Sequence, residues 1–595
     1  MLYPQTNRIR QSLEISGIWK FRADPEQRGE QEGWYRGFDS GVEIAVPGSW
    51  NEQLEELGLL HYVGAAWHQR SVFVPAECAD RRLVLRIGSA DYSSKVWANG
   101  QFVGEHQGGF LPFEFDITSV IQPGAEALIT IKVDNQLSRD TIPQGICFED
   151  YVNENRLRDE TYPPARFDFS PFGGIHRPVW IYTTPASFLR NVMVDTSIIS
   201  GSRGRVQVNV FTERADGMKV DGTLEGDGQV IVQHGRVTDG TTRLVFEIEN
   251  CRYWSPKNPF LHTLDLALTN EDGVLDMYRM SVGVREVKID GHKLFLNGEE
   301  IYLKGFGRHE DFTVVGKGLS LPVLVKDFNL MRWIHANSFR TSHYPYAEEV
   351  LDMADRNGFL VIDEVPAVSL DLRYANDRMI RNHKQFIADL IERDYNHPSV
   401  VMWSLGNEPN LVGDEGYVKG SGRNYWNDVF SFARSLDDHR PFTVPNCLRA
   451  GSDDPVFEFS DILTINRYYG WYEYPGRLEF ALQQLEKEMD ELHKKFKKPI
   501  MMTEFGADAI PGLHSASDQL FTEEYQEKMI RMYISLVRSK PYIIGEHVWG
   551  FADFRTPQHF RRVMFNMKGV FTRARQPKAA AFALRNLWKE QDSSQ

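Results

Sequence analysis

Two apolar runs in the second half of the chain each lead directly to a glutamate. Residues 400–405 (VVMWSL) are followed at once by Asn407 and Glu408, and residues 499–506 (PIMMTEFG) contain Glu504, 96 positions after Glu408. A short run of β-branched and bulky residues is typical of a strand buried on both faces. An α/β barrel keeps its chemistry at the carboxyl ends of such strands. The pattern therefore predicts two glutamates at one barrel mouth.

Residues 1–184 alternate short strand-like runs with turn signals and show hardly any helical periodicity. Residues 82–87 (RLVLRI) and 127–133 (ALITIKV) are such runs, and the Asn-Gly pair within residues 95–103 (KVWANGQFV) is typical of a β-hairpin. Many short antiparallel strands joined by Gly and Pro turns predict a jelly-roll sandwich.

Residues 185–285 continue as β structure with a different rhythm. Runs such as 206–210 (VQVNV) and 244–248 (LVFEI) are separated by polar turns. About one hundred residues with some seven short strands predict an immunoglobulin-like β-sandwich, although the Cys…Trp…Cys spacing of true immunoglobulin domains is missing. No Gly/Ser linker separates the two modules, so we expect them to pack rigidly.

Residues 286–595 change to an alternation of strands and helices. Eight strands alternate with helices over about 300 residues, which is the size and rhythm of a (β/α)8 TIM barrel. Helices are expected near residues 323–334, 348–356, 381–395, 424–435, 477–494, 523–537 and 577–588, and the fifth unit has almost none. The chain is thus predicted to be a multidomain β plus α/β protein.

Composition and charge narrow the classes of partner. The 595 residues carry a net charge of −15 without a block of like charges, which argues against nucleic acid, because phosphate binding needs a basic footprint. The four cysteines, among them Cys147, have no CxxC spacing, which argues against a zinc site or a disulfide framework. No membrane span or signal peptide is recognisable, so we expect a soluble cytoplasmic protein, and we expect a homo-oligomer, a dimer or a tetramer.

Two carboxylates at one mouth suit the hydrolysis of a glycosidic bond. The leaving oxygen needs a general acid, and the anomeric carbon needs a second carboxylate that attacks it or activates water. No nucleophilic Ser or Cys motif and no metal cluster accompanies Glu408 and Glu504, so we expect neither a metal nor a cofactor. Single carboxylates at strand ends also cap helices or pair with arginine. Two glutamates that each follow an apolar strand-like run, as Glu408 and Glu504 do, favour a catalytic role.

The motifs around the two glutamates resemble those of glycoside hydrolase family 2. Residues 403–409 (WSLGNEP) are similar to its acid/base motif and residues 503–508 (TEFGAD) to its nucleophile motif. The likeness extends along the chain through GIWKF at 17–21, VPGSW at 46–50, GGIHR at 173–177 and NSFRTSHYPYAE at 337–348. The resemblance implies a retaining enzyme with a jelly roll and an immunoglobulin-like sandwich before the barrel. It also implies that Glu408 is the general acid/base, Glu504 the nucleophile and Asn407 a ligand of the sugar 2-hydroxyl, with the two carboxyl groups about 5–5.5 Å apart.

A second motif bears on the substrate. Asn566 and Lys568 (NMK), ahead of the matching stretch GVFTRARQPK, resemble the Asn-x-Lys motif with which β-glucuronidases of this family bind the C6 carboxylate. Lys568 would supply the positive charge that a carboxylate in a closed site requires, and Asn566 a directional donor. On spacing alone the motif is weak, because an exposed lysine in a loop is the ordinary alternative. Its position after the last strand strengthens it.

The resemblance also assigns residues around the sugar. Tyr468 is expected to touch the nucleophile, Tyr472 to lie on the carboxylate side, and Trp549 to form a platform under the sugar ring. Arg562 is expected to be a second cation near the carboxylate. The residues expected to bind substrate are Asp168, His343, Asn407, Asn466, Tyr468, Tyr472, Trp549, Arg562, Asn566 and Lys568.

Several of these expectations have plainer alternatives. Asp168 is expected to reach the sugar hydroxyls from the first domain, although an aspartate in a loop often caps a turn. His343 is expected to bind substrate, but it could equally be a buried histidine with a satisfied hydrogen bond. Arg340 is expected to orient the nucleophile and keep it ionised, because a nearby cation favours the carboxylate. We interpret Asp363 and Glu364 as structural.

The resemblance therefore implies an exo-acting retaining β-glucuronidase. The alternatives are a β-galactosidase or β-galacturonidase of the same family, and more remotely a non-catalytic carbohydrate-binding protein. Residues 365–379 form a shorter segment than the insert that several gut bacterial glucuronidases carry over the leaving-group side. We therefore expect an open leaving-group side and a preference for larger glucuronides.

Overall fold

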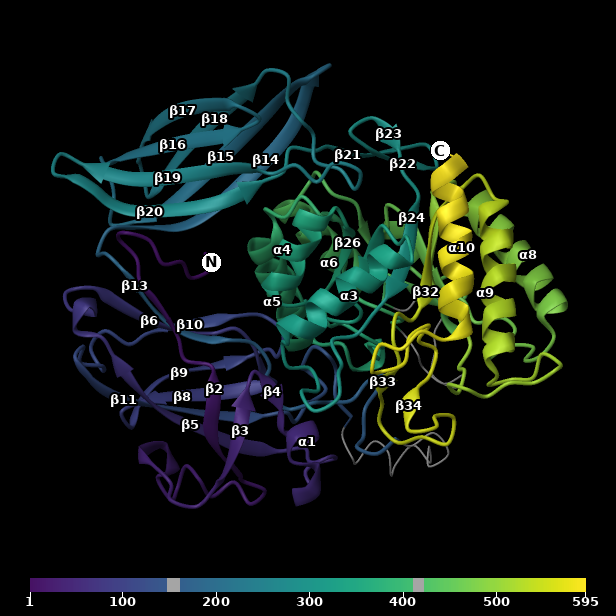
Figure 1. Cartoon of the computed structure of the whole chain (residues 1–595), viewed down its shortest axis with the longest axis horizontal. Coiled ribbons are helices and arrows are strands. Elements are labelled where there is room, and N and C mark those ends of the chain that lie inside the picture. Colours follow the sequence, from purple (N-terminus) through teal and green to yellow (C-terminus); the bar gives the residue numbers. More distant parts are fainter. Residues whose placement is uncertain (147–160, 410–421, 595) are drawn as a thin grey trace.

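The computed structural model describes residues 1–146, 161–409 and 422–594 (Figure 1). Purple and blue strands form one β-rich part, teal strands form a second, and green to yellow helices surround the third. Cys147, the cysteine named above, lies outside the described residues.

The first part is a sandwich of two antiparallel sheets around one core. Leu85 from one sheet and Ile131 from the other are fully buried in the same cluster. The predicted antiparallel sandwich is confirmed, and its jelly-roll winding stays a prediction. The four-stranded sheet has the order β1 (Ser12–Glu14), β13 (Val179–Thr184), β6 (Arg82–Ile87), β10 (Phe113–Asp116), and the six-stranded sheet β3 (Val42–Val46), β2 (Gly17–Ala23), β5 (Ala65–Val74), β11 (Ala125–Asp134), β8 (Ser93–Ala98), β9 (Gln101–Gln107).

The second part is a seven-stranded sandwich, which matches the predicted number of strands. Its strands are longer than the short runs predicted, because outward-facing polar residues interrupt each apolar run without ending the strand. In β15, for example, the buried Val206, Val208 and Val210 alternate with the less buried Gln207 and Asn209. One sheet has the order β14 (Phe188–Ser200), β15 (Arg203–Glu213), β18 (Thr241–Ile248), and the other β17 (Gln229–Arg236), β16 (Lys219–Gly226), β19 (His262–Asn270), β20 (Gly273–Val282).

The third part is a curled parallel sheet whose two edges meet. β28 and β29 lie at opposite ends of the strand order, yet only Val444 and Pro445 separate them in sequence. The fifth strand predicted at residues 442–444 corresponds to β28 alone, and the chain continues directly into β29 at the other edge. The sheet therefore curls into the predicted barrel. The order is β28 (Phe442–Thr443), β27 (Val400–Ser404), β26 (Leu360–Glu364), β25 (Ser338–Arg340), β24 (Leu303–Gly307), β32 (Ile543–Trp549), β31 (Ile500–Glu504), β30 (Leu463–Asn466), β29 (Asn446–Cys447).

Helices cover the outside of this sheet, close to the predicted positions. Asn376 caps α5 by accepting hydrogen bonds from the backbone N–H groups of Arg378 and Met379, and Thr522 caps α9 in the same way. The fifth unit has the one-turn helix α7 and the short 3-10 helix η5 (Leu448–Ala450), in line with the expectation of almost no helix. The helices are α3 (Leu321–Trp333), α4 (Glu348–Asn357), α5 (Asp377–Asp394), α6 (Arg423–Leu436), α7 (Val456–Phe459), α8 (Leu478–Phe496), α9 (Glu523–Arg538) and α10 (Ala579–Ser594), the last of which begins two residues later than predicted.

Both β-rich parts contact the barrel through buried charged groups. Arg285, after β20, donates hydrogen bonds to the carbonyl oxygens of Pro398 and Val400, at 3.1 and 2.8 Å, and so holds the start of β27. Glu52 of the first part pairs with Arg555 and Arg573 of the barrel at 2.5 and 2.8 Å. The two β-rich parts also contact each other through the buried ion pair of Arg10 and Asp276 at 2.6 Å, which fits the expectation that they pack directly.

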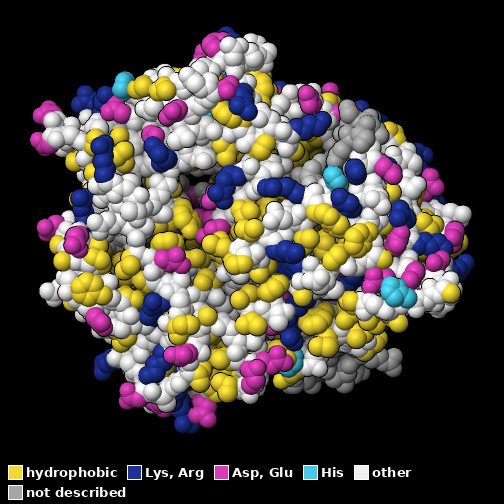
Figure 2. Space-filling model, viewed as in Figure 1, with side chains coloured by type: hydrophobic (Ala, Val, Ile, Leu, Met, Phe, Trp, Pro, Cys, Tyr) yellow, Lys and Arg dark blue, Asp and Glu magenta, His cyan; other side chains and the backbone are white. Residues whose placement is uncertain are grey.

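The surface carries charges of both signs. On the face shown in Figure 2, basic and acidic side chains are interspersed and do not gather into separate patches. Among the helices that the structure describes, none combines the length and the apolar character needed to cross a membrane.

Candidate active site

Five polar or aromatic side chains occupy the last positions of neighbouring barrel strands. Arg340 ends β25, Glu364 ends β26, Asn466 ends β30, Glu504 ends β31 and Trp549 ends β32. The carboxyl ends of parallel strands meet at one edge of the sheet, so these side chains gather at one mouth of the barrel.

Glu408 follows β27 and is held by the backbone on both sides. Its backbone N–H donates a hydrogen bond to the carbonyl oxygen of Pro445 at 2.8 Å. The neighbouring N–H of Asn407 donates to the carbonyl oxygen of Ala367 at 3.0 Å. The φ angle of Glu408 is 47°, in the left-handed region that residues other than glycine rarely adopt. Such a conformation persists only where its surroundings enforce it, and it is commonest at functional sites.

The environment of Glu408 favours the protonated form. Part of the residue is exposed, whereas its carboxyl group is enclosed by protein. Burial, followed by the negative charge of Glu504, raises the pKa of Glu408 to about 7, although Asn466 and Arg340 act in the opposite direction. Asn466 Nδ2 donates a hydrogen bond to Glu408 Oε1 at 2.8 Å. Glu408 can therefore hold a proton at near-neutral pH.

Glu504 receives a donor on each carboxylate oxygen. Arg340 donates to Oε1, and the hydroxyl of Tyr468 donates to Oε2 at 2.7 Å. Two such donors stabilise negative charge and fix the plane of the carboxylate. The site thus combines a group that can give up a proton with a carboxylate that can attack carbon. These are the two components that glycoside hydrolysis requires.

Glu364 is the shared hydrogen-bond partner of Arg340, His343 and Ser404 in this site. It accepts hydrogen bonds from Arg340 at 2.8 and 2.7 Å, from Ser404 at 2.7 Å, and pairs with Nδ1 of His343 at 2.8 Å. Burial acts to raise the pKa of Glu364, but Arg340, His343 and Ser404 together hold it below its ordinary value. The structural interpretation of Glu364 fits these contacts. Asp363, which accepts a hydrogen bond from Thr341 at 2.9 Å, is also enclosed in the barrel.

His343 lies within the site. Its ring stacks on Trp549 with the centroids 5.0 Å apart, and its Nε2 atom is 3.9 Å from Glu504 Oε1. Nδ1 of His343 is thus hydrogen-bonded to Glu364, as the alternative of a buried histidine with a satisfied hydrogen bond predicted. Its other nitrogen, Nε2, faces Glu504, the candidate nucleophile.

Lys568 forms a second charged centre at the same mouth. Its ammonium group donates to Asp508 at 2.5 Å and to the hydroxyl of Tyr472 at 2.9 Å. The rings of Tyr468, Trp471 and Tyr472 surround it, with centroids at 5.7, 5.6 and 4.9 Å. A buried ammonium among aromatic faces gains cation–π attraction.

The first domain reaches this centre through Asp168. Arg562 Nε donates to Asp168 Oδ2 at 3.1 Å, and Asn566 Nδ2 donates to the same oxygen at 2.9 Å. Arg562 also donates to the hydroxyl of Tyr472 at 2.7 Å. Arg562 and Asn566 belong to the hairpin region of β33 (Phe554–Arg555) and β34 (Phe565–Asn566), which Figure 1 shows in yellow beside the barrel.

The structure brings the predicted residues together in one mouth, in two adjoining groups. The first surrounds the glutamates and the second surrounds Lys568, and Tyr468 belongs to both. Sequence reasoning missed Asp508, the partner of Lys568. The available signal was its position four residues after Glu504, inside the TEFGAD motif.

The cluster of potential metal ligands in the described part of the chain lies elsewhere. Asp352, Asp355 and His397 approach one another outside the mouth. Burial opposes protonation of His397, but Asp355 outweighs it and raises the pKa of His397 to about 9. In this cluster Nδ1 of His397 and Oδ2 of Asp355 form an ion pair 2.6 Å apart.

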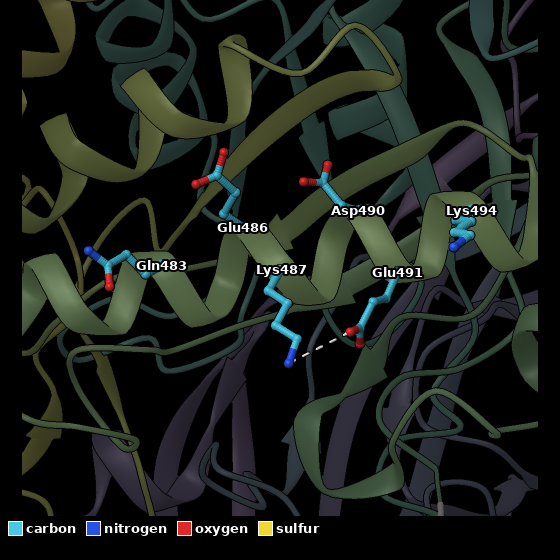
Figure 3. Close-up of a pocket in the computed structure, with 6 residues that line it drawn as sticks. All are labelled: Gln483, Glu486, Lys487, Asp490, Glu491 and Lys494. Carbon is cyan, nitrogen blue, oxygen red and sulfur yellow. Dashed lines mark ion pairs between the residues drawn. The ribbon is translucent and has the colours of Figure 1, made fainter.

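A hollow of about 380 Å³ lies on the outer surface, away from the barrel mouth (Figure 3). Side chains of α8 line it, and Lys487 pairs with Glu491 there at 3.9 Å. Because charged side chains of one exposed helix form it, the hollow offers no convergent set of groups for catalysis. The lining residues are Gln483, Glu486, Lys487, Asp490, Glu491 and Lys494.

Family models match nearly the whole chain. Residues 12–185 match the sugar binding domain of glycosyl hydrolases family 2, residues 187–285 a further model of that family, and residues 287–592 its TIM barrel domain. The TIM-barrel model covers more than half of the chain and includes both candidate glutamates.

Individual relatives agree over the full length. The chain is 42% identical to a β-glucuronidase from Paenibacillus borealis, over 99% of both chains, and 38% identical to a human β-glucuronidase, over 99% of this chain and 92% of the other. A solved Ruminococcus gnavus β-glucuronidase in complex with D-glucuronic acid has a TM-score of 0.89 and 35% identity, with 99% of both chains covered. The chain belongs to glycoside hydrolase family 2.

Proposed function

We propose that the protein is an exo-acting, retaining β-glucuronidase, which hydrolyses β-D-glucuronides to glucuronic acid and an alcohol. The position of Lys568 carries this proposal. Its ammonium lies in a buried aromatic cage at the same barrel mouth as Glu408 and Glu504, and an anionic substituent on the sugar can pair with it. The full-length likeness to proteins named β-glucuronidase supports the same substrate class.

The two glutamates act in sequence. Glu408 gives its proton to the glycosidic oxygen while Glu504 attacks the anomeric carbon, and the bond between that carbon and the leaving oxygen breaks. Formation of the glycosyl ester neutralises Glu504, and one cause of the raised pKa of Glu408 disappears. Glu408 is then the stronger acid and remains a carboxylate, as a general base must. It takes a proton from water, which attacks the anomeric carbon and releases Glu504.

The surrounding residues position the sugar. Arg340 and Tyr468 fix the Glu504 carboxylate for attack, and Asn407 is the proposed ligand of the sugar 2-hydroxyl. Trp549, stacked on His343, is the proposed platform under the ring. Asn466, whose amide contacts both Asn407 and Glu408, holds these two together.

The uronate carboxylate is proposed to bind at the second charged centre. Lys568 supplies the charge, Asn566 a neutral donor, and Tyr472 a hydroxyl that already contacts Lys568 and Arg562. Arg562 is proposed as the second cation, and Asp168 as the contact of the first domain with the sugar hydroxyls. No cofactor takes part in this mechanism.

A panel of p-nitrophenyl β-glycosides tests the substrate class. Glucuronide, galacturonide, galactoside and glucoside share one leaving group, so differences in kcat/KM report the sugar alone. We expect the glucuronide to exceed the galactoside and glucoside by at least about a hundredfold. A larger value for the galactoside, or for the galacturonide, would favour one of the rival family 2 specificities.

The leaving-group side is proposed to admit larger glucuronides. The segment after Glu364 is short, and residues 365–370 pack against the barrel in buried positions. A comparison of kcat/KM for a small aryl glucuronide and an oligosaccharide glucuronide tests this. Much faster turnover of the small substrate would contradict it.

Location and assembly are separate proposals. Cys78, Cys251 and Cys447 are buried and unpaired, which supports a reducing compartment, and we propose the cytoplasm. We also propose a homodimer or homotetramer. Light scattering from the purified protein measures its assembly, and a monomer would contradict this proposal.

A further inference from the structure

We propose that Asp508 sets the charge of the uronate-binding pocket and thereby limits how tightly the glucuronic acid product is held. It is a positioning residue that acts through Lys568 and Arg562. This inference rests on the proposed β-glucuronidase function and adds a determinant of product release.

Asp508 is fixed between the two proposed uronate cations. It is 2% exposed, its Oδ1 accepts a hydrogen bond from the N–H of Met567 at 2.9 Å, and its Oδ2 accepts one from Lys568 at 2.5 Å. Arg562 NH1 lies 3.5 Å from the same Oδ2. Burial acts to raise the pKa of Asp508, but Lys568 and Arg562 outweigh it and hold the pKa below its ordinary value. Asp508 is therefore an anion at neutral pH.

The pocket is electrically balanced before substrate enters. Lys568 pairs with Asp508, and Arg562 pairs with Asp168, so two cations face two carboxylates. Arg562 NH1 is a buried donor without a hydrogen-bond partner in the described parts of the chain. The net charge of these four side chains is therefore close to zero.

This balance matters because substrate and product carry the same carboxylate. A pocket with an excess of positive charge would stabilise the bound glucuronate as strongly as the bound glucuronide, and such uniform binding does not accelerate the chemical step. Asp508 opposes the uronate charge at close range in a partly buried site, where electrostatic interactions are strong. Its presence weakens the attraction of Lys568 and Arg562 for the uronate carboxylate and thereby makes the release of that carboxylate easier.

The substitution Asp508→Asn removes the charge and keeps the shape. The amide oxygen can still accept the Met567 N–H, and the NH2 group then faces the Lys568 ammonium. Lys568 loses this one acceptor but keeps the Tyr472 hydroxyl and the three surrounding rings. We expect the inhibition constant of glucuronate to fall by about tenfold or more, with a parallel fall in KM for p-nitrophenyl glucuronide and no rise in kcat. The inhibition constant of glucose and the KM for the glucoside should change by less than about twofold, because neither ligand carries the charge.

Two further variants separate charge from structure. Asp276→Asn is the matched control, because Asp276 is likewise buried and pairs with a cation, Arg10, at 2.6 Å, on β20 of the second sandwich away from the barrel mouth. It should leave glucuronate inhibition nearly unchanged. Asp508→Glu retains the charge and should keep the glucuronate inhibition constant within about threefold of the unmodified protein, whatever its effect on folding stability.

The outcomes distinguish this inference from the proposed function. If the unmodified protein does not hydrolyse glucuronides, the proposed function fails. If it does, but Asp508→Asn leaves glucuronate inhibition unchanged, weakens it, or alters glucose inhibition equally, then Asp508 has no role in charge balance and the inference is wrong.

Discussion

The side-chain amide of Asn466 donates a hydrogen bond to Oε1 of Glu408 at 2.8 Å. Thr503 donates to the amide oxygen of Asn466 at 2.8 Å, which turns the NH2 group toward Glu408. A donor at this position stabilises the carboxylate form and acts to lower the pKa of Glu408, against the effects of burial and Glu504. Asn466 therefore moderates the acid strength of the proposed proton donor and also fixes its position.

Replacing Asn466 tests this relationship. Asn466→Ala removes the donor, so the pKa of Glu408 should rise above about 7 and the alkaline limb of the kcat/KM profile should move to higher pH. At the optimum, kcat should fall by about tenfold because the acid is less well positioned. Steady-state rates across the pH range measure both effects. A limb displaced to lower pH would contradict the assigned role of the amide.

The unmodified protein should lose activity on the alkaline side. Glu408 must be protonated to assist the leaving group, and its pKa is about 7 in the unliganded structure. The value of kcat/KM for a glucuronide should therefore fall about tenfold per pH unit well above pH 7. A leaving group that needs little protonation, such as p-nitrophenolate, should show a weaker decline than a simple alcohol. Equal declines for both substrates would exclude Glu408 as the acid.

Lys568 should govern the preference for a charged sugar. Lys568→Ala removes the cation proposed to pair with the uronate, so kcat/KM for the glucuronide should fall by about a hundredfold to a thousandfold. The value for a neutral glucoside should be unchanged or higher. Lys487→Ala is the matched control, because this lysine lies on the outer face of α8 (Figure 3) and should leave both substrates unaffected. Equal losses for both substrates would contradict the proposed role.

The carboxylate of Glu504 should be indispensable for turnover. Glu504→Gln preserves the shape of the side chain but replaces the attacking oxygen, and kcat should fall by at least about a thousandfold. Glucuronate should still raise the melting temperature of the variant, because the second charged centre is intact. Substantial residual activity would remove the basis for an enzyme with this nucleophile and would favour the carbohydrate-binding alternative.

The stereochemical course should be retention. A double displacement through Glu504 inverts the anomeric carbon twice, so the first sugar released should be the β-anomer. Proton NMR spectra recorded in the first minutes of hydrolysis distinguish the anomers before they equilibrate. The α-anomer as first product would show that water attacks directly and that Glu504 acts as a base.

Local sequence patterns predicted the frame of the site well, because strand burial and strand ends leave clear signatures. The apolar run before Glu408 is β27, fully buried, and the run before Glu504 is β31. The positive φ of Glu408 has no such signature, because backbone contacts from neighbouring strands impose it.

Local sequence patterns did not predict contacts between segments that are far apart in the sequence. Asp508 and Lys568 are 60 positions apart, and nothing near either residue indicates that the end of β31 and the β33–β34 hairpin adjoin. The continuation of β28 into β29 at the other edge is similarly invisible, because it reflects the closure of the whole sheet. The family resemblance, rather than periodicity, placed Asp168 near the barrel.

The contact of Asp168 with Arg562 and Asn566 has a consequence for modularity. The barrel contains both glutamates, yet a barrel produced alone would leave Arg562 and Asn566 without the carboxylate that orients them. The N-terminal sandwich therefore contributes a side chain to the proposed active site, and we expect that exchanging it for the equivalent domain of a relative alters substrate selection. The N-terminal sandwich and the barrel therefore form one functional unit, which is larger than the barrel that carries both glutamates.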